Sequence, residues 1–374
     1  MEYFEFALMF FYDTVLHLIC VLGVLVLIVF VHEIGHYLVA RWCGISASVF
    51  SIGFGPEICG FVDKYGTRWR VAALPFGGYV RFLGDQDAAG FPSEHDERKF
   101  PGNSFPEAHV WKRAATVFAG PFFNTLFTVF VLSILFFFFG RTIIIPVVTD
   151  VLPDSPAARA GFKPGDRFLT MQGNPVSSFG EVAHYVMIHA DDPVNFTIMR
   201  QGHSLEMIVR PEVERTDDGF GNPIHVGRIG IVGSSNPENI HKIDYNLFES
   251  FRQGIHDSTY IIRQTGQVIG RFIQGRGDRC QLSGPLRSAQ IAWKVSDFGL
   301  LALLQLAAFF SISIGLFNLL PIPPLDGGYL IFYLLEGVTG RPVPLRVQTI
   351  IFRTGFILVF LFMVFTLLNN YISC

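Results

Sequence analysis

Three ionisable residues stand close together in an apolar stretch, FVHEIGHYLVARW at 30–42. His32 and His36 are four residues apart, so a helix would present both imidazoles on one face, one turn from each other. Glu33 lies between them in the sequence. This is the HExxH pattern, in which two imidazoles bind zinc and the glutamate acts as a general base. The spacing therefore predicts a metal site with hydrolytic chemistry.

The surroundings of these residues favour a metal site over a helix that merely contains histidines. Residues 16–30 are almost wholly apolar, and His17 is their only strongly polar member. His32 would lie about 26 Å of helix beyond Val15, near the membrane edge that Arg41 marks. A charge at the bilayer centre costs about 2.5 kcal/mol or more, and a bound metal would offset that cost.

A second unusual stretch, FNLLPIPPLDGGYLIF at 317–332, closes a later apolar segment. Its prolines break the helix before Asp326 and two glycines. Irregular backbone at membrane depth is tolerated only where it is buried in protein or lines a cavity. An ordinary loop turn also explains Asp-Gly-Gly, but the topology derived below brings Asp326 to the leaflet of His32 and His36. Because a catalytic zinc usually has three protein ligands and one open position, we expect Asp326 to be the third ligand.

The composition also indicates a membrane protein. The chain has 374 residues, of which 50% are hydrophobic and 16% are charged. Soluble proteins carry about 25% charged residues. The net charge of −3 and the lack of a basic stripe argue against nucleic acid as a partner. The five cysteines show no spacing typical of a metal site or a disulfide framework.

Four apolar segments approach the roughly 20 residues that a bilayer requires. They lie at 14–41, 115–139, 299–320 and 354–370. The first has no basic stretch before it and no small-residue cleavage site after it, so we expect it to remain in the mature protein. The predicted fold class is an α-helical integral membrane protein with about four transmembrane helices.

Basic residues near the segment ends predict the orientation, because they are enriched on the cytoplasmic side. Residues 1–13 and 354–374 contain no Lys or Arg. The connections after the first and third segments do contain them, at Arg41, Arg98, Lys99, Lys112, Arg113, Arg341, Arg346 and Arg353. We therefore expect both termini and residues 141–298 outside, with the metal site near the cytoplasmic leaflet.

The long stretch between the second and third segments contains a predicted α+β domain. We expect a short helix between Ser155 and Gly161, and a hairpin at 194–212. Together, residues 142–215 are typical of a PDZ-like domain, a fold that accepts an added peptide strand. A small mixed domain that serves only as a spacer is the alternative.

The chain thus divides into four predicted parts. They are the first half of the membrane core at 1–141, the PDZ-like domain at 142–215, an extracytoplasmic linker at 216–298 and the second half of the membrane core at 299–374. The linker contains an amphipathic helix at 244–275, which packs on the PDZ-like domain or lies at the outer membrane face.

Two further features belong to the first half of the membrane core. RWRVAALPFGGYVRF at 68–82 predicts a β-hairpin with its turn near Gly77-Gly78, close to the metal site. Its exposed edge could capture an unwound substrate by strand addition, and a plain surface hairpin is the alternative. Asn124 lies inside the second apolar segment, where we expect it to form a hydrogen bond between helices.

These motifs together resemble the site-2 protease family of intramembrane zinc metalloproteases, and within it the bacterial group that regulates sigma-E. The matching stretches are HEIGH, SIGFGP at 51–56, LPFGGYVRFLGD at 74–85, AGPFFN at 119–124, LSGP at 282–285 and NLLPIPPLDGG. They cover nearly the whole chain. The resemblance implies one zinc ion per chain held by His32, His36 and Asp326, with Glu33 as the catalytic residue and Asn318 helping to hold substrate.

The resemblance also implies a biological setting. It predicts regulated intramembrane proteolysis in the bacterial cell inner membrane, with the hairpin dipping into the lipid bilayer. The expected partners are single-pass membrane proteins such as an anti-sigma factor, and remnant signal peptides are further expected substrates. The best-known relatives carry two tandem PDZ domains, whereas this sequence has room for one, so a two-domain size filter does not carry over.

A second function class stays open at this point. The chain could be a non-catalytic membrane adaptor whose PDZ-like domain recruits partners while the metal site is structural. A structural zinc site has four protein ligands and needs no general base, whereas this chain offers three ligands and Glu33. The residues therefore favour the enzyme. Iron or cobalt would bind similar ligands.

Overall fold

The computed structural model describes residues 2–84, 103–217, 223–233, 239–277 and 284–369. Clustering of contacts divides the chain into two compact units. The first consists of Met1–Ile134, Phe251–Thr265 and Pro285–Phe365, and the second of Leu135–Ser250, Gly266–Gly284 and Thr366–Cys374. Arg98, Lys99 and the first two residues of the LSGP stretch, on which sequence expectations rest, lie outside the described residues.

Four helices in the described part of the chain are long and apolar enough to cross a membrane. They are α1 (Glu2–Trp42), α2 (Val110–Phe139), α7 (Leu300–Asn318) and α9 (Leu345–Asn369). Each overlaps one predicted apolar segment. The helices α2 and α9 begin earlier than predicted, because a helix continues into a polar turn whose Lys and Arg side chains can reach the interface.

Polar contacts join the membrane helices of the first unit. Thr128 on α2 donates its hydroxyl to the carbonyl of Ala308 on α7 at 2.8 Å. Near the other end of the unit, His17 Nε2 on α1 lies 2.6 Å from Asp297 Oδ1, just after α6 (Pro285–Ser296), and its ring stacks on Trp293 of α6. Such contacts hold α1, α2, α6 and α7 together where the apolar side chains give no directional preference.

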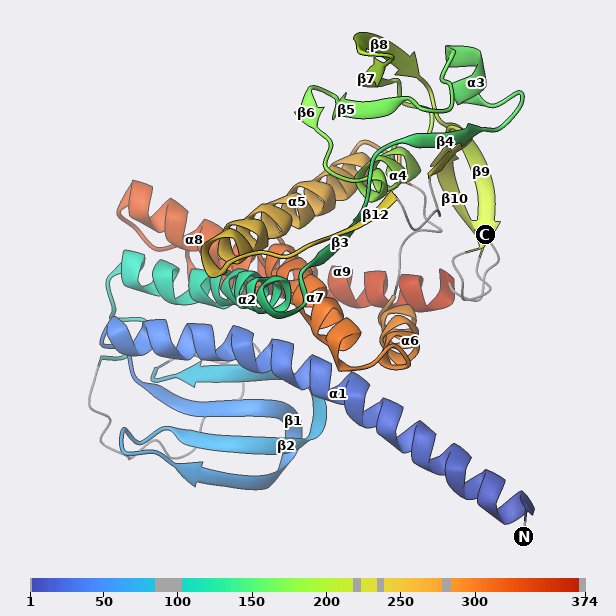
Figure 1. Ribbon diagram of the computed structural model, residues 1–374. Coiled ribbons are helices and arrows are strands. Elements are labelled where there is room, and N and C mark those ends of the chain that lie inside the picture. Colours follow the sequence, from blue (N-terminus) through green and yellow to red (C-terminus); the bar gives the residue numbers. More distant parts are fainter. Residues whose placement is uncertain (1, 85–102, 218–222, 234–238, 278–283, 370–374) are drawn as a thin grey trace. The chain divides into compact units, whose positions relative to one another are not determined.

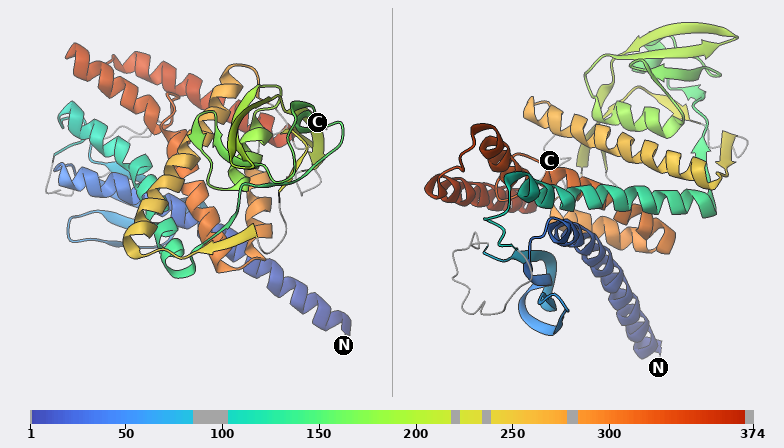
Figure 2. Two further views of the ribbon diagram at one scale, coloured as in Figure 1. Left: turned by 45° about the horizontal axis from the view of Figure 1, so that its top comes forward. Right: turned by 90° about the vertical axis from the view of Figure 1, so that its left-hand side faces the viewer.

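Two long strands, β1 (Ala47–Val62) and β2 (Arg68–Phe82), pair antiparallel and contact α1 (Figures 1 and 2). Both strands bend, so that residues 49–52 have a partner on each side; Ser51 pairs with Tyr79 and with Arg70. Residues 57–62 pair with 68–72. Among the described strands, residues 78–82 pair on one side only and form an edge of this sheet.

This arrangement corrects the predicted hairpin within 68–82. That segment does not pair with itself but forms one bent strand whose partner is β1. The reason is the packing of Phe50, which is fully buried and stacks on Trp69 with ring centroids 4.2 Å apart. Burying Phe50 places the first half of β1 between the two halves of β2.

Asp63 fixes the turn between β1 and β2 to α1. Its carboxylate accepts hydrogen bonds from the Tyr37 hydroxyl at 2.7 Å and from the Trp69 indole N–H at 3.1 Å. It also accepts from the backbone N–H groups of Tyr65 and Thr67, both at 2.9 Å. One carboxylate therefore joins the turn, the sheet and the helix that carries the HExxH pattern.

The second unit is rich in strands. Its four-stranded sheet has the order β6-β5-β7-β8, and three further strand pairs are β3 with β12, β4 with β11, and β9 with β10. The strands are β3 (Arg141–Ile144), β4 (Val148–Val151), β5 (Arg167–Met171), β6 (Asn174–Pro175), β7 (Val194–Arg200), β8 (His203–Val209), β9 (Glu212–Asp217), β10 (Pro223–Arg228), β11 (Ile231–Gly233) and β12 (Ile240–Ile243).

Several local predictions for this unit are confirmed. Helix α3 (Pro156–Ala160) has Ser155 as its N-cap and Gly161 as its C-cap. The predicted hairpin is β7 and β8. Helix α4 (Phe179–Ile188) packs within the same core as Phe168 and Phe196, both of which are buried.

The predicted amphipathic helix is α5 (Leu247–Ile273). Its first turn is closed by a capping box, in which Asn246 and Glu249 exchange side-chain and backbone hydrogen bonds. The middle of α5, from Phe251 to Thr265, belongs to the first unit, whereas its two ends belong to the second.

We expect Asp63→Ala to loosen the β1–β2 sheet from α1. Four donors would lose their acceptor, three of them in partly buried hydrogen bonds, and a net contribution of about 0.5–1.5 kcal/mol is typical of each such bond. Hydrogen exchange of residues 47–82 in detergent should accelerate, whereas exchange in α9 should not change. Glu57→Ala, which removes an ion pair with Arg68 elsewhere on the sheet, is the control and should have little effect. Equal exchange in Asp63→Ala and wild type would refute this role.

The stabilisation that the Asp63 carboxylate provides should depend on pH. Burial raises the pKa of Asp63, but the hydrogen bonds from Tyr37, Trp69 and the backbone outweigh burial and leave this pKa below its usual value. The ionised carboxylate therefore stabilises the fold fully above its unfolded pKa of about 3.9. The stabilisation is lost as the pH falls through the lower folded pKa, so wild type and Asp63→Ala should converge in acid.

Candidate metal centre

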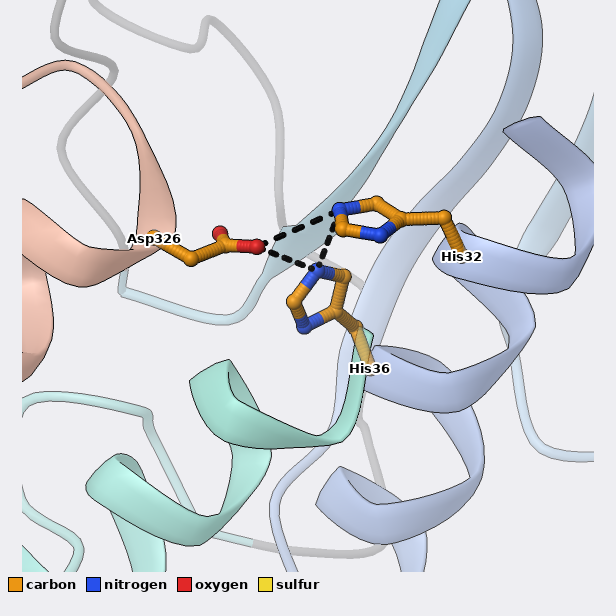
Figure 3. A group of neighbouring side chains, drawn as sticks. All are labelled: His32, His36 and Asp326. Atoms are coloured by element: carbon orange, nitrogen blue, oxygen red, sulfur yellow. Dashed lines mark hydrogen bonds and ion pairs between the residues drawn. The ribbon is translucent and has the colours of Figure 1, made fainter. Parts of the chain in front are cut away.

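Two histidines and one aspartate converge on a single point (Figure 3). His32 Nε2 and His36 Nε2 are 3.2 Å apart. Asp326 Oδ2 lies 3.2 Å from the first nitrogen and 3.5 Å from the second. The three side chains are 12%, 10% and 19% exposed, so water has little access to them. The structure thus brings together residues that are far apart in the sequence.

These separations match the coordination geometry of zinc. Metal–ligand bonds of about 2.0–2.1 Å arranged as a tetrahedron give ligand atoms about 3.3 Å apart. The three separations of 3.2, 3.2 and 3.5 Å are those of one tetrahedral face. Three protein ligands leave the fourth corner open, as in catalytic rather than structural zinc sites.

The hydrogen bonds of these residues also point to a cation. His36 Nδ1 lies 2.9 Å from the carbonyl oxygen of Thr116 and must therefore carry the proton, which leaves a lone pair on Nε2. Asp326 Oδ2 is buried and accepts no hydrogen bond from a protein donor in the described residues. Lone pairs that face one another without a donor between them fit a positive ion at their common centre.

Secondary structure explains how the three side chains meet. His32 and His36 follow one face of α1 at helical spacing. Asp326 is the first residue of α8 (Asp326–Thr339). The short connection from α7 turns back tightly, with Ile322 donating its N–H to the Leu320 carbonyl at 2.7 Å. A helix N-terminus also favours a carboxylate electrostatically.

The helix α2 forms the wall behind the two histidines. Thr116, Gly120 and Asn124 recur every four residues and therefore share one face of α2. A Cβ atom at Gly120 would lie 2.3 Å from His36 Nε2 and 2.8 Å from Cε1 of His32. Only glycine therefore allows α2 to approach the imidazoles this closely.

The other two predicted site residues also lie beside the centre. Asn318, the last residue of α7, places its Nδ2 3.3 Å from His32 Nε2. Glu33 interacts electrostatically with the histidines and Asp326, and its carboxylate also interacts favourably with the backbone N–H of Val80. Val80 belongs to the edge segment of β2, so the edge of the sheet reaches Glu33.

The edge strand can come this close because it has a glycine at the contact. A Cβ atom at Gly78 would lie 3.2 Å from Cγ of Glu33 and 2.8 Å from Cγ1 of Val29. Gly78, which the sequence placed at a turn, is instead the point where this strand contacts α1.

Sequence reasoning missed three parts of the site. The carbonyl of Thr116 is a backbone group, so its residue type gives no signal. Gly120 was seen only as part of a matching stretch. Asn124 was expected to form a hydrogen bond between helices, and this is confirmed: it is fully buried, and its carboxamide on α2 lies 3.3 Å from His32 Nδ1 on α1. The sequence did not show that its partner is a candidate metal ligand. The four-residue spacing of these positions, matching that of the two histidines, could have revealed the shared face.

Comparison with known proteins agrees with the geometry. The model of peptidase family M50 matches residues 20–362. A protein of Bartonella henselae named as a zinc metalloprotease is 48% identical over 353 residues, which cover 92% of this chain and 98% of that protein. One from Brucella suis with the same kind of name is 45% identical over 361 residues, 94% of each chain. Metalloprotease MmpA of Caulobacter vibrioides is 33% identical over 385 residues, again 94% of each.

We expect Gly120→Ala to weaken zinc binding by at least about tenfold, because the added methyl group displaces the imidazoles from their tetrahedral face. Zinc affinity of the purified full chain would be measured by competition with a chromophoric chelator. Gly23→Ala on α1 is the matched control, since a Cβ there meets nothing within 4 Å. Equal zinc affinity in the two variants would contradict the close contact.

Proposed function

The chain belongs to peptidase family M50, the site-2 protease family, and is a membrane zinc metalloprotease; on this premise we propose that it cuts a peptide bond within or near the transmembrane helix of single-pass membrane proteins. The observation that supports the site of cleavage is the location of the metal centre. His32 and His36 lie on a helix that is apolar enough to span a membrane, and Asn318 ends another. The substrate bond must therefore reach the enzyme at membrane depth.

Membership of a peptidase family decides between the two function classes that the sequence left open. It favours the enzyme over the non-catalytic adaptor. The set of only three candidate ligands and the nearby carboxylate of Glu33, which interacts electrostatically with all three, are the structural counterparts of that activity. A purely structural zinc site would need neither.

In the proposed mechanism, His32, His36 and Asp326 hold one zinc ion. When bound there, zinc supplies a Lewis acid that polarises the scissile carbonyl and lowers the pKa of a water molecule to about 7. Glu33 takes the proton from that water on its carboxylate and passes it to the nitrogen of the leaving amine. The edge of β2 lies against Glu33, where the backbone N–H of Val80 interacts favourably with the carboxylate.

Asn318 is the proposed substrate-binding residue. Its carboxamide lies next to His32 Nε2, at the boundary of the three-ligand face. From that place its N–H₂ group can donate to the oxygen of a bound peptide carbonyl. A donor aimed where negative charge develops stabilises the transition state more than the ground state.

The free edge of β2 is the proposed binding place for the substrate backbone. A peptide bond within a helix is shielded, so the substrate must unwind before it can be cut. An extended segment can replace its lost helical hydrogen bonds by pairing with residues 78–82. Since Gly78 and Val80 of this edge lie beside Glu33, a strand paired with the edge would lie next to the proposed proton acceptor.

The proposed setting is the bacterial cell inner membrane, with several spans per chain. Basic residues lie in the last turn of α1 at Arg41 and before the apolar part of α2 at Lys112 and Arg113, whereas residues 1–13 have none. This asymmetry supports a metal centre near the cytoplasmic leaflet and both termini in the periplasm. The lipid bilayer surrounds the spans.

We further propose that residues 142–215 form a PDZ-like domain in the periplasm. The order of its elements supports this assignment, because a capped short helix, a strand, a longer helix and a hairpin follow one another. The natural substrate class would be an anti-sigma factor already shortened outside the membrane, and remnant signal peptides are further substrates. The domain would recruit or restrain such chains.

The central test compares wild type with Glu33→Gln and Asp326→Asn in cleavage of a tagged single-pass reporter. We expect Glu33→Gln to keep its zinc and lose cleavage by at least about a thousandfold, since it removes proton transfer at both steps. We expect Asp326→Asn to lose both zinc and cleavage. Wild-type cleavage by Glu33→Gln at matched expression would overturn the mechanism.

Strand addition predicts a pattern in the substrate. Only every second backbone N–H of an added strand points to the edge. A proline scan across the reporter's cleavage site should therefore reduce cleavage at alternate positions, whereas a substrate bound as a helix would show a spacing of three to four. Reporters with alanine at the same positions are the controls. Cleavage that depends on proline with helical spacing would exclude pairing with the β2 edge.

A further inference from the structure

We propose that Asn124 is a positioning residue for the zinc site, which fixes the ring orientation and the tautomer of His32 by accepting a hydrogen bond from its Nδ1–H. The inference rests on the proposed role of His32 as a ligand. It assigns to Asn124 a function beyond joining two helices.

The two histidine ligands differ in how their far nitrogen is held. His36 Nδ1 donates to the backbone carbonyl of Thr116 at 2.9 Å. For His32, the group opposite Nδ1 is the carboxamide of Asn124, at 3.3 Å. A ligating histidine needs such a partner, because the hydrogen bond on one ring nitrogen determines which nitrogen presents its lone pair to the metal.

The chemistry of the site determines which end of the carboxamide faces the ring. His32 Nε2 must present a lone pair to the metal, so Nδ1 must carry the proton and needs an acceptor. The oxygen of Asn124 is that acceptor. Rotating the carboxamide by half a turn exchanges its oxygen and its nitrogen at nearly the same positions.

A second observation points to the same orientation. With the nitrogen of the carboxamide toward His32, Asn124 Oδ1 is buried and has no hydrogen-bond donor in the described residues. The whole residue is inaccessible to water. With Oδ1 turned toward His32, this oxygen accepts a hydrogen bond from the Nδ1–H. The same bond keeps the proton on Nδ1 and leaves the lone pair of Nε2 for the metal.

Asn124 is itself firmly held by the helices around it. Its backbone carbonyl accepts from the hydroxyl of Thr128 at 3.0 Å and from that of Ser311 on α7 at 3.2 Å. The same helix α7 ends at Asn318, shortly before Asp326. Asn124 thus contacts both His32 on α1 and the helix α7, which is followed in the chain by Asp326.

The test measures zinc affinity of the full chain in detergent by competition with a chromophoric chelator, together with the visible absorption of the Co²⁺ form. Asn124→Leu keeps the volume and removes the acceptor. We expect it to weaken zinc binding by about 10- to 100-fold and to change the cobalt spectrum. Asn124→Asp keeps an acceptor and should restore affinity to within about threefold of wild type.

Two reference variants separate this role from general packing. Ser133→Ala, further along the same helix, removes a hydroxyl that bonds to the Val129 carbonyl and not to Asn124, and it should keep both zinc affinity and cobalt spectrum. His32→Ala should lose zinc. Should His32→Ala bind zinc as wild type does, the proposed ligand set fails, and the positioning role fails with it.

Two results would overturn the positioning role while leaving the ligand set intact. One is wild-type zinc affinity and an unchanged cobalt spectrum in Asn124→Leu. The other is an equal loss in Asn124→Leu and Asn124→Asp, which would show that the site needs the shape of asparagine rather than its acceptor. Rescue by Asp alone supports the proposal.

Discussion

The convergence of three lone pairs on one point is the constraint on which the rest of the first unit depends. Two imidazole nitrogens and one carboxylate oxygen lie 3.2 to 3.5 Å apart with no donor between them in the described part of the chain. Such an arrangement is unfavourable without a cation, and it must be maintained by packing. The glycine at 120, the Thr116 carbonyl and the tight turn before α8 are the features that maintain it.

Much of the site could be predicted because polar residues are conspicuous in apolar segments. The HExxH residues and the Asp-Gly-Gly stretch interrupt spans whose length and composition are clear from the sequence, and the structure brings these residues together. The ends of α3 were predictable because Ser155 and Gly161 act locally. The family resemblance supplied Asn318, which no spacing argument had identified.

Other features could not be predicted from the sequence, for physical reasons. The pairing of β2 with β1 depends on the burial of Phe50 against Trp69, a contact that only the folded sheet reveals. The acceptor for His36 is a backbone carbonyl, which every residue type carries. Asn124 has the same side chain whether it joins two helices or faces a ligand, so its residue type could not distinguish the two.

The origin of the ligands at opposite ends of the chain has a consequence for biosynthesis. Two of the three candidate ligands come from α1, near the N-terminus, and the third from the start of α8. While the chain is being translated, its first helix enters the bilayer among other newly inserted helices, with two histidines and no aspartate beside them. The complete set of three candidate ligands therefore exists only after α8 has been made and has folded back onto α1.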